Sequence, residues 1–118
     1  MANDLPIHLR KVTLFSALPI STSPGLYHSS QQDVEDTISY AVQVSWSNGA
    51  ILDGQIYLEA SNDGSNWVQI QQSLLSIANA SGSHMINVEK PAYSFFRLSV
   101  SVFAGTATID ALFNAKRQ

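Results

Sequence analysis

Residues 55–70 read QIYLEASNDGSNWVQI, two alternating apolar runs on either side of a polar turn. In the first run apolar residues recur at every second position from Ile56 to Ala60, the spacing of a strand with one buried face. The second run begins at Trp67. Gly64 provides the positive φ that a tight turn requires. The stretch therefore predicts a β-hairpin, and its turn consists of Asn62, Asp63, Gly64, Ser65 and Asn66.

Alternation continues on both sides of this hairpin. Residues 38–47 place every second apolar side chain on one face, and Asn48-Gly49 follows as a turn, so we expect 38–47 and 55–61 to pair with an elongated loop between them. A strand at 84–89 ends before Pro91, and longer runs at 93–103 and 106–115 flank Ala104-Gly105. The last four strands are expected to form an antiparallel meander. The short run 74–77 fits a strand end or a helical turn equally well.

The amino-terminal third has a weaker pattern. Residues 8–15 read as an edge strand, and residues 16–36 turn to Ser, Thr, Pro, Gly and Gln. So long a loop is unusual in a compact domain, so this stretch is either an arm that packs on a neighbour or holds a short strand near Leu26 and Tyr27. We expect a strand and extended arm over 1–36 and a core over 37–118, within one folded domain.

Together these patterns predict an all-β fold. About seven or eight short strands, regular turns and no amphipathic helix are typical of an antiparallel β-sandwich or jelly roll, here with an irregular N-terminal arm. A length of 118 residues suits a single domain.

Composition restricts the partners. Hydrophobic residues make up 45% of the chain and charged residues 13%, so the surface is expected to be largely neutral. Six basic and nine acidic residues give no basic stripe, which argues against nucleic acid. The N-terminus does not resemble an export signal, and no apolar run could span a bilayer, so we expect no membrane insertion.

No residue pattern indicates catalysis, a cofactor or a metal. The three histidines, at positions 8, 28 and 84, do not have the spacing of paired ligands, and there is no cysteine. A calcium loop of the EF-hand type has glycine at its sixth position, whereas Gly64 directly follows Asp63, the first carboxylate of this turn. A tight turn is therefore favoured over a metal loop. We therefore expect a protein that is not an enzyme.

Aromatic residues supply the candidate contact sites. Trp46 shares a face with apolar neighbours and is expected in the core. Trp67 lies beside the polar turn, and Tyr57 and Phe103 fall opposite the predicted core, so these three are the predicted surface contacts.

Two resemblances follow from these residues. The SNDGSNW turn resembles one found in discoidin-like carbohydrate modules and in small bacteriophage virion proteins. The segments YAVQVSWSNG, SHMINVEKPAYSFFRLSVS and AGTATIDALFNAK are similar in order and spacing to short phage structural proteins, over residues 38–116. Discoidin modules are longer and usually carry a disulfide, which this cysteine-free chain lacks.

The phage resemblance implies a structural virion protein of the capsid decoration, fibre or vertex-associated type. Such a protein is made in the host cytoplasm, resides in the virion, and contacts copies of itself and other virion proteins. The discoidin resemblance implies the alternative, a carbohydrate-binding module that contacts a host-surface glycan.

Overall fold

The computed structural model describes residues 8–117, with the side chains of residues 10–47, 49, 53–70 and 72–116. Over this range the chain forms strands and turns, with no helix, so none of it could cross a membrane as a helix. The strands are β1 His8–Ser21, β2 Leu26–His28, β3 Gln32–Asp33, β4 Thr37–Ser61, β5 Val68–Ile77, β6 Gly82–Glu89 and β7 Phe95–Arg117. All their pairings are antiparallel.

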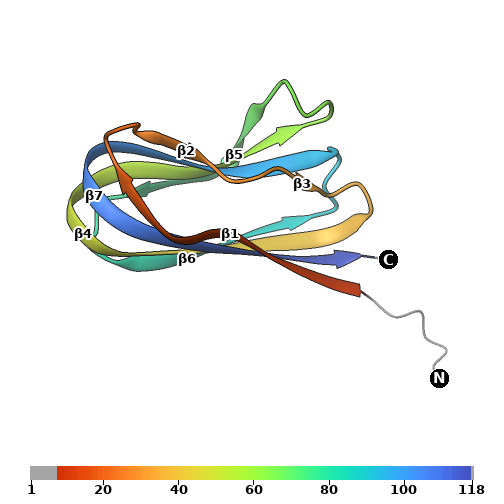
Figure 1. Cartoon of the computed structure of the whole chain (residues 1–118). Coiled ribbons are helices and arrows are strands. Elements are labelled where there is room, and N and C mark those ends of the chain that lie inside the picture. Colours follow the sequence, from red (N-terminus) through yellow and green to blue (C-terminus); the bar gives the residue numbers. More distant parts are fainter. Residues whose placement is uncertain (1–7, 118) are drawn as a thin grey trace.

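The two longest strands, β4 and β7, run through both layers of the molecule. Residues 37–47 of β4 pair with residues 108–117 of β7, and residues 53–61 pair with residues 95–104. Between these two ladders both strands bend together at one end of the molecule, as Figure 1 shows. The register shifts between Ser47 and Gly54, and Gly105 on the partner strand has a φ of +82°.

Each half of the β4–β7 ladder forms the centre of one layer. Sheet A consists of β1, residues 106–117 of β7, residues 37–47 of β4, and β6. Sheet B consists of β2, β3, residues 95–104 of β7, residues 53–61 of β4, and β5. The protein is therefore an antiparallel β-sandwich, as the sequence predicts.

Two expected hairpins are absent from this part of the chain. The segments 38–47 and 55–61 do not pair with each other, and neither do 93–103 and 106–115, because each pair belongs to one bent strand. The expected meander is also wrong, since β6 pairs with β4. Apolar residues alternate on both sides of each bend, so a strand that curls around the core buries both runs without reversing direction.

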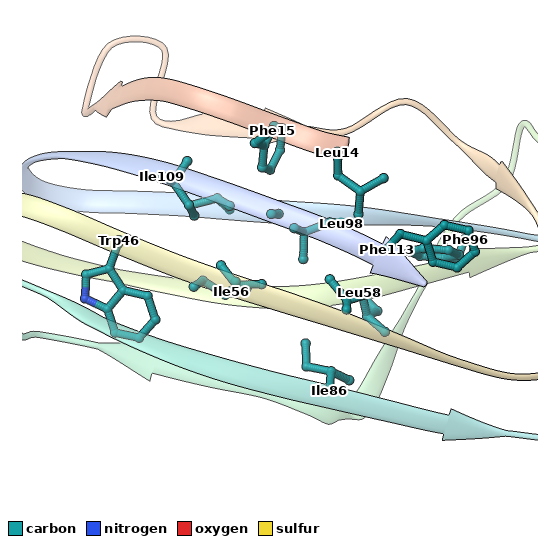
Figure 2. Close-up of a cluster of buried hydrophobic side chains, with 14 of the residues drawn as sticks. Leu14, Phe15, Trp46, Ile56, Leu58, Ile86, Phe96, Leu98, Ile109 and Phe113 are labelled. Atoms are coloured by element: carbon teal, nitrogen blue, oxygen red, sulfur yellow. The ribbon is translucent and has the colours of Figure 1, made fainter. Parts of the chain in front are cut away.

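The core fills the space between the sheets, and aromatic rings join them at one end. The ring of Tyr40 stacks on Phe96 with centroids 4.6 Å apart, and Phe113 lies 4.9 Å from Phe96. At the other end Trp46 is buried, and its indole N–H donates to the carbonyl of Asn79. Figure 2 shows Phe96 and Phe113 side by side, with Trp46 at the opposite end of the cluster.

The described part of the amino-terminal third packs on β7. Strand β1 pairs along residues 106–117 of β7 and buries Leu14, Phe15 and Ile20 in the shared core. Of the two alternatives for residues 16–36, the structure has the short strand: β2 covers Leu26–His28 and pairs with residues 99–101. Residues 1–7 of the expected arm lie outside the described residues.

Candidate functional site

The outer face of sheet B carries polar and aromatic side chains that the strand register brings together. On β7, Arg97 and Ser99 alternate with buried core residues and so point away from the core. Glu59 of β4 lies opposite Arg97, and Tyr57 lies opposite Ser99. His28 of β2 lies opposite Ser99 on its other side. We call the outer residues His28, Tyr57, Glu59, Trp67, Arg97 and Ser99 the Trp67 surface.

A carboxylate organises the polar part of this surface. Glu59 Oε1 accepts hydrogen bonds from Arg97 Nε at 2.8 Å and from Ser99 Oγ at 2.8 Å. His28 Nδ1 lies 2.8 Å from Ser99 Oγ. A serine hydroxyl has one proton, and here it is donated to Glu59, so His28 Nδ1 carries the proton that bonds Ser99 Oγ. The cluster is thus internally paired.

This order of contacts differs from that of a hydrolytic triad. In a triad the imidazole stands between the hydroxyl and the carboxylate and accepts the hydroxyl proton. Here Ser99 contacts Glu59 directly, His28 is a donor to Ser99, and Ser99 is fully buried. The cluster does not activate a nucleophile.

The charge state of His28 follows from its surroundings. Burial lowers the pKa of His28, the nearby Arg97 guanidinium lowers it further, and Glu59 acts in the opposite direction. His28 Nδ1 also lies 3.5 Å from Glu59 Oε1, a distance that would allow an ion pair. Because the lowered pKa keeps the ring neutral near pH 7, the contact between His28 and Glu59 is not an ion pair. The positive charge that balances Glu59 comes from Arg97.

Arg97 also fixes the aromatic part of the surface. Its guanidinium carbon lies 4.4 Å from the centroid of the Trp67 ring, a cation–π contact. Trp67 is half-buried and stands between the turn and β5. One arginine therefore contacts both the indole of Trp67 and the carboxylate of Glu59.

The turn residues 62–66 connect β4 to β5, and Ala60 of β4 pairs with Val68 of β5 on either side of the turn. Gly64 has a φ of +76°, the positive value expected for it. Asp63 Oδ1 accepts from the backbone N–H of Ser65 at 2.9 Å and of Asn66 at 2.8 Å, and Asp63 Oδ2 accepts from Asn66 Nδ2 at 2.7 Å. Both oxygens of the Asp63 carboxylate therefore accept hydrogen bonds from within the turn. Among the described residues, no three His, Asp or Glu side chains converge as a metal site would require.

Asp63 is expected to make stability sensitive to acid. The N–H donors of Asn66 and Ser65 hold the pKa of Asp63 well below its ordinary 3.8. A carboxyl whose folded pKa lies below its unfolded value contributes stability above about pH 4 that is lost as the pH falls through the folded value. Urea unfolding at about pH 5 and about pH 2 should therefore show a smaller loss for Asp63→Asn than for wild type.

The control for this comparison is Asp53→Asn, which removes an exposed carboxylate from β4. An acid-dependent loss of stability that is the same in wild type and Asp63→Asn would show that the turn hydrogen bonds do not favour the ionised carboxyl.

The three predicted contact residues do not form one site. Tyr57 and Trp67 both belong to the Trp67 surface and are half-buried. Phe103 is 59% exposed, but it lies at the bend of β7, six residues beyond Arg97, about 20 Å along an extended strand. The sequence alone did not indicate four residues of this surface, which are His28, Glu59, Arg97 and Ser99. The outward alternation of Arg97 and Ser99 was a usable signal, but their partners on β2 and β4 depend on strand order.

The outer face of sheet A presents a second surface, with a different character. Met85 of β6 is 49% exposed and Leu112 of β7 is 42% exposed. Gln43 of β4 pairs with both residues, so the three form a row across three strands. A shallow hollow of about 160 Å³ lies beside this row, and Lys11 is the single charged residue in its lining. We call the lining residues Lys11, Ala41, Gln43, Met85, Leu112 and Asn114 the Met85 surface.

No protein-family model matches the sequence, and no curated protein matches it. Several solved structures share the fold. A subunit from Bacillus endospore appendages, described as a family of disulfide-linked pili, has a TM-score of 0.57 and 11% identity over 100% of this chain and 96% of that chain. A carbohydrate-binding module of the family 9 glycoside hydrolase Cel9A from Ruminococcus flavefaciens has a TM-score of 0.52 and 16% identity, over 92% of this chain and 98% of that chain.

A third structure, the PBSX exported protein XepA, has a TM-score of 0.55 and 13% identity over 95% of this chain and 37% of that chain. This chain therefore spans about a third of XepA. At these identities the likenesses show the fold, a β-sandwich that serves both assembled appendages and carbohydrate-binding modules.

Proposed function

We propose that the chain is a structural virion protein, of the capsid decoration, fibre or vertex-associated type, that acts by assembly and surface binding. The observation that carries the proposal is the Met85 surface. Two large apolar side chains, Met85 and Leu112, stand exposed in one row across the sheet face. Exposed apolar groups that lie side by side favour burial against another protein.

Three further features support this proposal. The sequence resembles short phage structural proteins over residues 38–116. The appendage subunit matches this chain over nearly the full length of both, and the endospore appendages are pili. Those pili are disulfide-linked, whereas this chain has no cysteine, so its assembly would depend on noncovalent burial and strand pairing. The proposed location is the virion, after synthesis in the host cytoplasm.

The proposal predicts a defined oligomer. Light scattering coupled to size exclusion should give the full chain the mass of a symmetric assembly at micromolar concentration. The double variant Met85→Lys, Leu112→Lys should dissociate it, because two charges on the Met85 surface oppose burial. Val68→Lys is the matched control, since Val68 is 70% exposed and lies outside that surface.

A wild-type chain that stays monomeric at every concentration would contradict self-assembly. The virion location is tested separately: a tagged chain, produced in the host during particle formation, is expected to sediment with purified particles. Its absence from the particle fraction would contradict a structural virion role.

The Trp67 surface favours a second candidate function, carbohydrate binding. An indole is suited to stack on the apolar side of a sugar ring, Trp67 is partly exposed beside the polar turn, and the Cel9A module shares the fold. On a glycan array wild type should bind, and Trp67→Ala should reduce binding at least about tenfold, while Val68→Ala should not. No binding by wild type, or equal binding by Trp67→Ala, would exclude this function.

A further inference from the structure

The described strands leave several sheet edges open. Strands β1, β2 and β3 pair only with β7, and strands β5 and β6 pair only with β4. An open edge presents unpaired backbone N–H and C=O groups, which are a template for another strand. Proteins usually protect such edges with bulges, prolines, charges or short length.

Four of the five edge strands carry such protection. Along β1 the register shifts twice, Ala17 has a φ of +45°, and Arg10, Lys11 and Pro19 lie on the strand. Strands β2 and β3 have only three and two residues.

Strand β5 bulges where it passes Leu58. Leu58 pairs with Ile70 and Ile56 pairs with Leu75, so four residues of β5, 71–74, lie opposite the single residue Tyr57 of β4. Within this bulge the hydroxyl of Ser73 accepts a hydrogen bond from the N–H of Leu58 at 2.8 Å. A bulged strand is a poor template for a straight partner.

Strand β6 has none of these features. All eight residues from Gly82 to Glu89 pair in sequence with β4, with no shift of register and no proline. Its single carboxylate, Glu89, is the last residue, and Met85 in the middle is 49% exposed. The edge of β6 is therefore regular in register and lacks the protective features of the other four strands.

We propose that β6 pairs antiparallel with β6 of a second copy, about a two-fold axis at Met85. This proposal rests on the proposed assembly function and names its self-contact. Residues opposite each other in an antiparallel pair lie on the same face, so Met85 meets Met85 of the second copy and both side chains are covered. The two copies of sheet A then form one continuous sheet.

Charge favours this arrangement over a parallel one. With the axis at Met85, Glu89 lies opposite Ser81 of the second copy, and the two Glu89 carboxylates stand at opposite ends of the pair. A parallel in-register pair would place these like charges side by side, which is destabilising. The strand therefore pairs with the same strand of a second copy without placing like charges opposite each other.

Single variants of the full chain distinguish pairing at the β6 edge from a contact made through the outer face of sheet A. Met85→Lys should raise the dimer dissociation constant at least about tenfold, because it places two ammonium groups opposite each other on the pair. Leu112→Lys is the matched control: it adds the same charge to the same sheet face, but on the interior strand β7. It should leave the dimer intact.

A cysteine trap gives an independent readout that does not depend on destabilising the pair. The chain has no cysteine, so any cross-link must come from the introduced residue. Opposite residues in an antiparallel pair have Cβ atoms about 4.5 to 5.5 Å apart, near disulfide distance. Mild oxidation should therefore cross-link Met85→Cys into a covalent dimer and leave Leu112→Cys monomeric on a nonreducing gel.

The outcomes distinguish the two levels of the proposal. An oligomer that Leu112→Lys dissociates and Met85→Lys does not would overturn the β6 pairing and retain the assembly function. A wild-type oligomer in which Met85→Cys does not cross-link would likewise overturn the two-fold axis at Met85. A wild-type chain that is always monomeric would overturn both.

Discussion

The antiparallel ladder between β4 and β7 is the constraint on which the rest of the structure depends. It passes through both layers of the sandwich, so the two sheets are connected by backbone as well as by side-chain packing. Every other strand pairs with one of these two. The stack of Tyr40 on Phe96 then joins sheet A to sheet B at the end of the ladder away from the bend.

This architecture places the functional surfaces on the outside of the ladder. Because the core takes every second side chain of β4 and β7, the intervening residues form two outer faces of different chemistry. On sheet B, Glu59, Arg97 and Ser99 satisfy one another, and Phe103 is exposed near the bend. On sheet A, Leu112 of β7 and Met85 of the neighbouring β6 are exposed in one row.

The period-two alternation was sufficient to predict the fold class and most of the core. Trp46, Phe96 and Phe113 are all buried where the pattern placed them. The strand order could not be predicted, because the residues that permit a hairpin also permit a bend. Asn48-Gly49 and Ala104-Gly105 allow the chain to change direction, but whether it reverses depends on a partner strand far away in sequence.

The candidate site was predictable only in part for the same reason. Trp67 could be selected because it follows a polar turn, but its contact with Arg97 joins residues that are thirty positions apart. His28 lies in a stretch with no periodic pattern, and it reaches Ser99 through a three-residue strand. Such contacts follow from tertiary pairing, which local sequence does not encode.

Hydrogen exchange at single-residue resolution tests the role of the β4–β7 ladder most directly. If the ladder is one cooperative unit, the paired amides of residues 39–47 and 54–61 should share one free energy of opening, the highest in the molecule, and so should their partners in β7. If the amides on the two sides of the bend instead open with clearly different free energies, the two sheets are separate units, and the central role of the continuous ladder is contradicted.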